Sequence, residues 1–520
     1  MIDDARRIPD ATTLQADLCI VGAGAAGITM ARALAPTGLR VVVLESGGFE
    51  FDPEIQDLYS GSVAPAGSYA LDSTRLRYFG GTTNHWAGFC RPLDAIDFRA
   101  REWVRDSGWP ITAADLAPFY RRAQATCQLG AFDYDGKAWA QRIGKDAFET
   151  LPIDEARFRT SIFQYSPPTR FGAAYRDELA RSAAVQVFLY ANATNIDVDD
   201  DGAAAGVDVR AWKGAAFRVQ ARAYVLACGA IDNARLLLAS NSKRVQGVGN
   251  DHDLVGRYFA EHPIVETGEI ARARPDSAVE LYDGWTHAGT AGQGVLVLSE
   301  AAMAEHQLPN AGFFLFPQYD EEQTEGFRAF MDIAHAARRG DLPNDLGTKL
   351  KAVLTDLDGV ALPALRRLFR RGRFASRFRL RLFSEQVPNR DSRVTLTGER
   401  DALGMQRVEL AWRLSEADHR GFETSFEMLG RAFGAADLGR IRYEINHADV
   451  GGGSHHMGTT RMSDDPRRGV VDANCRVHGV GNLYIAGSSV FSTAGCSNPT
   501  LTIVALAERL ADHLASAYHR

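Results

Sequence analysis

The chain has 520 residues, which is too long for one simple core and predicts at least two domains. Hydrophobic residues make up 45% and charged residues 24%, as in ordinary globular proteins, and a formal net charge of -7 argues against nucleic acid as the main partner. The six cysteines are scattered and form no CxxC pair, which excludes a cysteine zinc site and a disulfide scaffold, so we expect no metal.

The N-terminal residues, MIDDARRIPDATTLQ, are polar and contain no apolar segment of the kind found in signal peptides. No apolar run in the sequence approaches the ~20 residues that a helix needs to cross a bilayer. We therefore expect a cytoplasmic protein without a transmembrane segment.

Residues 16–46, ADLCIVGAGAAGITMARALAPTGLRVVVLES, predict a strand, a glycine-rich turn, a helix and a second strand. Gly22, Gly24 and Gly27 have the G-x-G-x-x-G spacing, which allows a tight turn, close approach to a pyrophosphate and close helix packing. Glu45 ends the second strand, where its carboxylate can accept hydrogen bonds from a ribose. The segment predicts a bound dinucleotide, and its spacing allows FAD and NAD alike.

Later stretches predict further parts of a nucleotide-binding sheet and its loops. Residues 80–86, GGTTNHW, form a tight loop rich in hydrogen-bond donors. Residues 217–240 predict a strand, a break at Gly229 and a helix, which indicates that the same sheet is entered again. Residues 482–487, NLYIAG, predict a short strand, and the NPT at 498–500 opens the last helix with its asparagine as N-cap.

Residues 265–440 have a different texture, in which strand-like and helix-like runs alternate. Within them, residues 362–383 are strongly basic. We interpret this stretch as a solvated helix whose Leu and Phe side chains face the core, rather than as an amphipathic surface for a membrane or a partner.

Three separated blocks resemble the glucose-methanol-choline (GMC) oxidoreductases, a family of FAD enzymes. They are GAGAAG with Glu45, GGTTNHW, and HHMGTTRM…GVVDANCRVHGV…NLYIAGSSVF…NPT, in the family's order along nearly the whole chain. The resemblance, and not the glycine spacing, selects FAD over NAD. It implies an α/β fold with a Rossmann-like FAD-binding domain and an interleaved α+β substrate domain on a mainly antiparallel sheet. The expected FAD-binding domain comprises residues 1–110, 171–265 and 441–520, and the expected substrate-binding domain comprises residues 111–170 and 266–440.

The stretch GGGSHHMGTTRM at 451–462 carries two adjacent histidines. The family's His-x-x-Gly-Thr pattern matches His455 and its second catalytic position matches Asn498, which leaves His456 in a supporting role. A His–Asn pair is similar to that of the pyranose oxidase and sugar oxidoreductase branch. It implies oxidation of a secondary hydroxyl, at C2 or C3 of a pyranose, to the ketone. In that reaction His455 is the general base, Asn498 orients the substrate oxygen and a hydride passes to flavin N5.

The residues expected to bind FAD lie in the glycine loops, at strand ends and at the start of the last helix. They are Gly22, Gly24, Ala25, Ala26, Gly27, Glu45, Ser46, Gly80, Gly81, Thr82, Asn84, His85, Trp86, Ala193, Thr194, Ala227, Gly229, Gly487, Ser488, Asn498, Pro499 and Thr500. His85, directly before Trp86, matches the position at which some sugar oxidases of the family attach FAD covalently, but Asn84 stands where we expect Thr. A covalent bond through His85 and a non-covalent contact with the flavin both stay open.

The resemblance also implies the partners. The substrate is a small-molecule alcohol, a sugar or glycoside, and the electron acceptor is oxygen, a quinone or another compound. Alternatives are the same chemistry on a non-sugar biosynthetic alcohol, a flavin-dependent lyase or light-driven decarboxylase of the family, and a non-catalytic flavoprotein. Outside the motifs, we expect His262 to be a buried structural residue and His447 to lie near the pocket without an assigned role.

Overall fold

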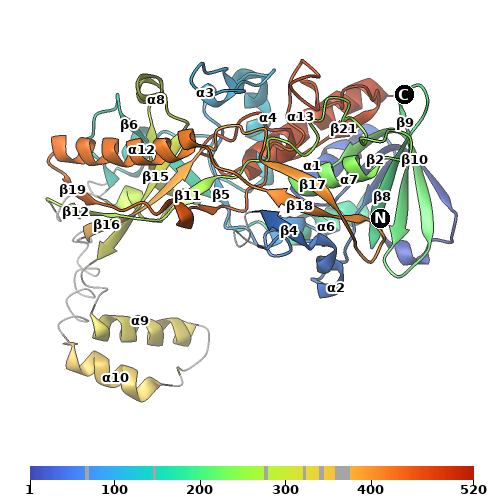
Figure 1. The fold of residues 1–520 in the computed structure, drawn as a ribbon. Coiled ribbons are helices and arrows are strands. Elements are labelled where there is room, and N and C mark those ends of the chain that lie inside the picture. Colours follow the sequence, from blue (N-terminus) through green and yellow to red (C-terminus); the bar gives the residue numbers. More distant parts are fainter. Residues whose placement is uncertain are drawn as a thin grey trace.

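The structure is a computed structural model, which describes residues 1–64, 70–144, 148–274, 279–319, 324–338, 343, 345–357 and 375–519. Within these residues the chain forms two large β-sheets, a small three-stranded sheet and the helices packed around them (Figure 1). No helix in the described ranges is both long and apolar enough to cross a bilayer.

The first large sheet is mainly parallel and joins segments that are far apart in the sequence. β10 lies at its centre, with β2 parallel on one side; on the other side β9 is antiparallel to its first half and β21 parallel to its end. β3 is the run VVVL, buried throughout, as is typical of a parallel strand covered on both faces. The strands are β1 (Ile2–Asp4), β2 (Thr13–Val21), β3 (Val41–Leu44), β7 (Val185–Leu189), β8 (Ala191–Val198), β9 (Ala204–Ala211), β10 (Ala216–Leu226) and β21 (Leu483–Ile485).

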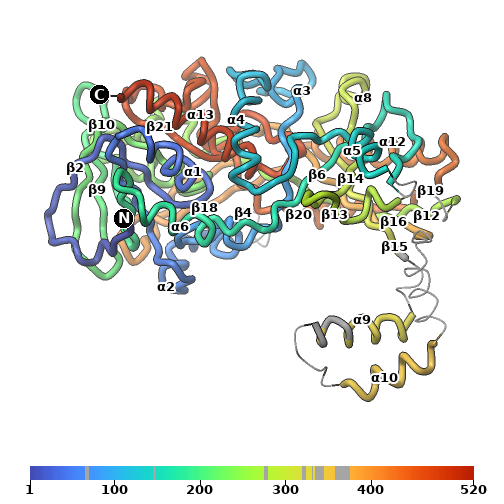
Figure 2. Tube along the Cα trace, turned by 180° about the vertical axis from the view of Figure 1, so that it is seen from behind, coloured from blue at the N-terminus to red at the C-terminus, as the bar shows by residue number. Residues whose placement is uncertain are grey.

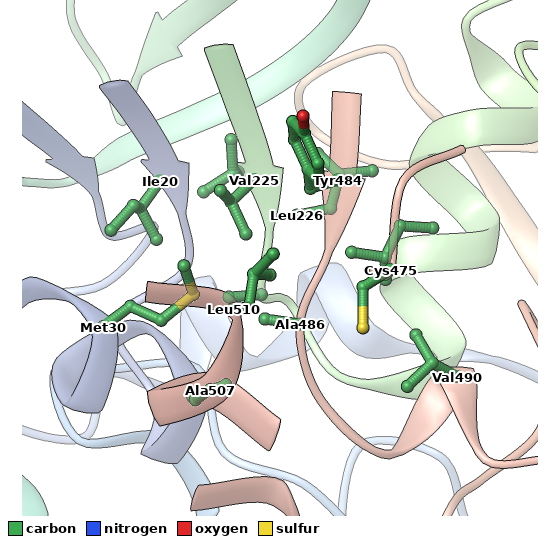
Figure 3. Close-up of a cluster of buried hydrophobic side chains, with 14 of the residues drawn as sticks. Ile20, Met30, Val225, Leu226, Cys475, Tyr484, Ala486, Val490, Ala507 and Leu510 are labelled. Atoms are coloured by element: carbon green, nitrogen blue, oxygen red, sulfur yellow. The ribbon is translucent and has the colours of Figure 1, made fainter. Parts of the chain in front are cut away.

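Two helices from opposite ends of the chain close one face of this sheet. Side chains of β2 and β10, such as Ile20 and Val225, cluster with Met30 and Leu510 from the two helices (Figure 3). The predicted βαβ unit and the predicted return of the chain at β10 and β21 are therefore confirmed. The helices that flank the sheet are α1 (Ala25–Leu34), α6 (Phe171–Arg181), α7 (Ala230–Ala239) and α13 (Thr500–Tyr518).

Helix α4 (Ala113–Thr126) corrects the expected domain boundary. Its Leu116 and Tyr120 belong to the core of the first sheet, and the Tyr120 hydroxyl lies 2.8 Å from Thr502 Oγ1 on α13. The mixed texture of residues 111–170 predicts that this helix belongs to the substrate-binding domain. Its buried face, which packs on α13, assigns it to the nucleotide-binding part instead.

The second large sheet is antiparallel in every pairing within the described residues, which confirms the predicted substrate-domain sheet. Helix α12 (Glu416–Ala435) lies along one face, where Phe426 meets Phe313 at a ring distance of 5.0 Å (Figure 1). The strands are β5 (Phe89–Cys90), β6 (Phe158–Tyr165), β11 (Pro263–Val265), β12 (Glu269–Arg272), β13 (Trp285–His287), β14 (Thr290–Leu298), β15 (Ala311–Tyr319), β16 (Ala375–Ser384), β19 (Gly439–Arg442) and β20 (Gly451–Gly452). β11 and β20, expected in the FAD-binding domain, therefore belong to this sheet.

The basic stretch 362–383 does not form the expected helix in the part that the structure describes. Residues 375–383 lie in β16, where Phe378, Leu380 and Leu382 are buried and the arginines between them face the other side. The alternation of RFRLRLF has the period of two that is typical of a strand, and this period outweighs the basic composition. Residues 362–374 lie outside the described residues.

Two smaller units complete the fold. Strands β17 (Arg393–Arg400), β18 (Gln406–Ala411) and β4 (Gly61–Ala64) form the three-stranded sheet. Helices α9 (Glu325–Arg338) and α10 (Leu346–Thr355) pack on each other and stand apart from both large sheets (Figures 1 and 2). The other short helices are α2 (Pro53–Gln56), α3 (Ala95–Phe98), α5 (Gly136–Ile143) and α8 (Glu300–His306).

Candidate functional site

A cavity of about 590 Å³ opens at the carboxyl ends of the parallel strands, where ligands of such sheets usually bind. Most of the predicted cofactor residues line it, together with His455 and Asn498. They are Gly22, Gly24, Ala25, Ala26, Glu45, Ser46, Gly81, Thr82, His85, Trp86, Ala193, Ala227, Gly229, Gly487, Ser488, Asn498, Pro499 and Thr500. The structure therefore brings blocks from the beginning, middle and end of the chain together around one space.

Four of the predicted cofactor residues do not line the cavity and instead shape its walls. A Cβ on Gly27 would lie 1.8 Å from the Gly22 carbonyl oxygen, so this glycine allows the helix to approach the turn. Gly80 adopts a φ of 98°, and Asn84 beside it donates from Nδ2 to the Phe79 carbonyl at 2.8 Å. Thr194, the fourth, donates from Oγ1 to the Asp208 carbonyl at 3.2 Å.

Three glycines leave open space where a Cβ would enter the cavity. Gly24, Gly229 and Gly487 line the cavity, and no protein atom lies within 4 Å of an added Cβ on any of them. Backbone N–H groups in such loops can approach a ligand closely, because no side chain stands between. Glu45, at the end of β3, already accepts hydrogen bonds from the N–H groups of Ala23 and Gly47, each at 2.9 Å, which fixes its carboxylate at the cavity wall.

A buried arginine cluster beside the cavity was not predicted. Arg75 and Arg77 both contact Asp232, and their guanidinium groups lie 4.1 and 4.7 Å from the ring centre of Tyr59. Arg235 also contacts Asp232, at 3.8 Å, and pairs with Asp401, so three cations face two carboxylates and the cluster keeps positive charge. Arg77 Nε is buried without a hydrogen-bond partner. This donor set suits an anionic group such as a phosphate. The RLR that precedes the glycines at 80–81 was the available signal.

His85 lies on the cavity wall and is held from its far side. Its Nε2 atom is 2.9 Å from the hydroxyl oxygen of Tyr78, and the two rings meet edge to face. The next residue, Trp86, donates from its indole nitrogen to the Thr169 carbonyl at 3.0 Å. The loop is thus anchored at both aromatic side chains.

The second sheet positions His455 through a short ladder between two distant segments. Ala260 and Met457 exchange both backbone hydrogen bonds, at 3.0 and 2.9 Å, and the N–H of Gly453 donates to the His262 carbonyl at 3.2 Å. The residues between Gly453 and Met457 bulge toward the cavity. A Cβ on Gly453 would lie 2.7 Å from His455 Nδ1, so this glycine makes room for the imidazole rather than for a ligand.

A line of hydrogen bonds runs from a buried carbonyl through two histidines to the cavity. His262, fully buried, places Nε2 2.9 Å from the Gly495 carbonyl oxygen, and its Nδ1 is 3.0 Å from Nδ1 of His455. At the cavity end, His455 Nε2 is 3.3 Å from Asn498 Nδ2.

This line determines which nitrogen of each ring carries a proton. A carbonyl only accepts, so His262 Nε2 must be protonated. Burial lowers the pKa of His262 to about 4, which keeps the ring neutral at pH 7 and leaves a lone pair on Nδ1. His455 must therefore donate from its own Nδ1. Burial, and then the two neighbouring histidines, hold the pKa of His455 well below its usual range, so its Nε2 is unprotonated and accepts from the Asn498 amide at the cavity.

Helix α13 begins at Thr500 with Pro499 as its N-cap, so Asn498 lies just before the helix and is not the predicted cap. No hydrogen bond runs from its side chain to the first turn, and its buried Oδ1 has no hydrogen-bond partner. Its Nδ2 lies 3.3 Å from His455 Nε2, which places the amide at the cavity. The amide thus offers an N–H and an oxygen beside the lone pair of His455.

The structure places His456 and His447 in different surroundings. His456 lies on the cavity wall, with Nε2 3.4 Å from Oε1 of Glu261, while the other oxygen of this buried carboxylate accepts the N–H of His455 at 2.7 Å. Glu261 thus braces both histidines, and burial lowers the pKa of His456 to about 3. His447 is exposed, pairs with His419 and Glu423, and does not line the cavity.

Family models match most of the chain. A model described as FAD dependent oxidoreductase matches residues 17–332, and one described as GMC oxidoreductase matches residues 388–507. The chain is an FAD-dependent GMC oxidoreductase. Members of this family act on alcohols, as oxidases or dehydrogenases, so the protein is an enzyme for CH–OH donors.

Curated relatives and solved structures agree with the family. This GMC oxidoreductase is 28% identical to the 6'''-hydroxyparomomycin C oxidase of Streptomyces lividus, over 96% of this chain and 92% of that protein. It is also 28% identical to the C-glycoside 3-oxidase of Arthrobacter globiformis, over 61% of this chain and 52% of that one. The crystal structure of pyridoxine 4-oxidase from Mesorbium loti has a TM-score of 0.52 and 18% identity, covering 96% of this chain and 99% of its own, which supports the fold.

The cavity of the GMC oxidoreductase fits FAD by its own chemistry. The glycine-lined openings at Gly24, Gly229 and Gly487 accept a ligand against bare backbone, and the carboxylate of Glu45 can accept from ribose hydroxyls. The positive arginine cluster can offset phosphate charge. These residues would hold the cofactor.

Gly24 and Gly27 make a matched pair of substitutions that separates binding from folding. For Gly24→Ala we expect an unchanged fold, because the new methyl meets no protein atom, and FAD affinity lowered about tenfold, or roughly 1.4 kcal/mol. For Gly27→Ala we expect a stability loss of about 1–3 kcal/mol from the clash with Gly22. FAD titration and thermal unfolding of the cofactor-free protein measure both. Equal loss of stability in the two variants would contradict this assignment.

Proposed function

We propose that this GMC oxidoreductase oxidises a secondary hydroxyl of a sugar or glycoside, at C2 or C3 of a pyranose, to the ketone. The observation that carries the proposal is the lone pair of His455 Nε2, held toward the cavity beside the Asn498 amide. The names of the two relatives, an aminoglycoside oxidase and a C-glycoside 3-oxidase, support a glycoside as the substrate.

Oxidation of an alcohol removes a proton from oxygen and a hydride from carbon. FAD, when bound, supplies the acceptor for the hydride. His455 takes the hydroxyl proton on Nε2, because its lowered pKa keeps this nitrogen free of a proton at neutral pH. The Asn498 Nδ2–H group donates to the substrate oxygen as negative charge develops there. Once His455 is cationic, its Nδ1–H bond to His262 becomes charge-assisted, which stabilises the protonated base.

The reaction predicts that His455 controls the rate of flavin reduction but not FAD binding. Anaerobic mixing with a good glycoside should bleach the flavin absorbance of the wild-type enzyme. For His455→Ala we expect bound FAD and a reduction rate lowered about 10²- to 10⁴-fold, the usual contribution of a general base. His447→Ala is the control, since His447 lies outside the cavity, and it should react like the wild type. Unchanged reduction in His455→Ala would rule out this base.

The hydrogen-bond line predicts a positioning role for His262, in place of the buried structural role expected from the sequence. His262→Ala removes the acceptor for His455 Nδ1–H, so the base loses its fixed tautomer, and we expect kcat about 100-fold lower. His262→Asn places an amide oxygen near the same point and should restore most of the rate. A purely structural role would give two variants with similar rates and lower thermal stability. Single-turnover flavin reduction, with thermal unfolding in parallel, distinguishes these outcomes.

We propose further that FAD is held without a covalent bond. His85 Nε2 is engaged by the Tyr78 hydroxyl, and Asn84 replaces the expected Thr before it. Acid denaturation should therefore release FAD into the supernatant, and mass spectrometry of the denatured chain should give the mass of the polypeptide alone. A mass increased by FAD that disappears in His85→Ala would show covalent attachment instead.

A further inference from the structure

The face of the second sheet opposite α12 is lined by aromatic rings. Side chains alternate along β15, so Phe313 and Leu315 join the core beneath α12, while Phe314 and Phe316 belong to a separate cluster on the other face. We call this cluster the aromatic wall. Its rings are those of Phe89, Phe163, Tyr165, Phe314, Phe316 and Phe383.

The rings of the aromatic wall touch in a continuous row. Phe89 meets Tyr165 at a centroid distance of 4.6 Å and Phe314 at 6.0 Å, and Phe314 stacks on Phe316 at 6.3 Å with an interplanar angle of 14°. Phe89, Tyr165 and Phe316 are only partly buried, although they pack on a buried apolar cluster. Contiguous exposed apolar patches on proteins often mark ligand-binding grooves or interaction sites, whereas single scattered apolar residues do not.

The aromatic wall begins at the active site. Phe89 belongs to the wall and also lines the cavity that holds His455 and Asn498. Cys496, two residues before Asn498, packs into the same cluster. A substrate whose hydroxyl reaches His455 would therefore extend its remaining part along the wall.

Two arginines lie against the wall at Phe316, and Asp283 is the carboxylate whose charge acts on Tyr165. The guanidinium groups of Arg379 and Arg381 lie 5.8 and 5.1 Å from the ring centre of Phe316. Arg381 pairs with Glu266 at 2.5 Å, whereas among the described residues Arg379 has no carboxylate partner. Burial, and then the charge of Asp283, raise the pKa of the Tyr165 hydroxyl, which therefore stays neutral and donates to Gln293 at 2.5 Å.

The carboxylates that line the cavity are engaged on the cofactor side. Glu45 accepts two backbone N–H groups, and Asp232 contacts Arg75 and Arg77. Within the part of the chain that the structure describes, no carboxylate lines the cavity beside His455. A polycationic amino sugar would find aromatic rings and arginines there, and it would lose hydration without gaining ion pairs.

We propose that the aromatic wall binds the aromatic aglycone of an aryl glycoside, neutral or anionic, so that this enzyme selects aryl glycosides over simple alkyl glycosides and polycationic amino sugars. The proposal rests on the function proposed above and specifies its substrate class. Ring stacking on Phe316 and Tyr165 supplies the affinity, and Arg379 favours an acidic group on the aglycone.

The test compares phenyl β-D-glucoside, 4-carboxyphenyl β-D-glucoside, methyl β-D-glucoside and paromomycin by anaerobic flavin reduction. We expect kcat/KM for the two aryl glycosides about 10-fold or more above that for the methyl glycoside, and no reaction with paromomycin. Phe316→Ala should lower the aryl-to-methyl ratio about 3- to 10-fold, the range expected for one aromatic contact. Phe51→Ala, at an exposed phenylalanine outside the wall, is the control and should leave the ratio unchanged. Phe316→Leu keeps the apolar volume and serves if Phe316→Ala fails to fold.

The outcomes separate the two proposals. If the methyl glycoside reduces the flavin as fast as the aryl glycosides and Phe316→Ala leaves the ratio unchanged, the wall inference is wrong while the proposed function stands. If none of the glycosides reduces the flavin, the proposed function itself fails. Preferential reaction with paromomycin would also overturn the wall inference, as would a Phe316→Ala variant that changes the oligomeric state and not the substrate ratio.

Discussion

The site exists because β10 pairs in parallel with two strands from opposite ends of the chain. Its register with β2 sets Leu226 against Val21, and its register with β21 sets Leu226 against Ile485. Parallel pairing aligns the carboxyl ends of the three strands, so the three loops that follow emerge side by side. Each of these loops carries one of the open glycines of the cavity. If the register shifted by one residue, the buried and exposed faces of β10 would be exchanged and the loops would no longer meet.

The chemistry depends on a second pairing, between β11 and β20. Pro263 lies opposite Gly452 and Ile264 opposite Gly451, which holds the backbone of His262 beside the loop that carries His455. The tautomer of the base is then set by backbone carbonyls at 494–495, two groups that cannot titrate. A carboxylate in the place of His262 would hold the base by charge, as in hydrolase triads. Here the neutral His262 ring orients His455 through the direction of their hydrogen bond alone. It adds no negative charge, which suits a buried base that must stay unprotonated until the substrate arrives.

Local patterns predicted much of the fold and of the cofactor site. The glycine spacing at 22–27, the break at Gly229 and the strand before Gly487 each follow from residues close in sequence, and the structure places all three loops at the cavity. Contacts between distant residues were harder to foresee. His262 stands alone in AEHPI, and only the ladder between β11 and β20 reveals that it faces His455. The contact of Asn498 with His455 likewise joins residues that are distant in sequence.

The helical pair α9–α10 can vary without changing the rest of the fold. It lies between β15 and β16, which are already neighbours in the second sheet, with Ala311 opposite Ser384 and Gln318 opposite Arg377. The sheet needs only a tight turn at this point, so the described helices α9 and α10 are an addition to it, and long loops cost little extra closure entropy. Such a site tolerates replacement by chains of very different length. Variation in α9 and α10 can therefore leave the second sheet, the catalytic line and the nucleotide cavity as they are.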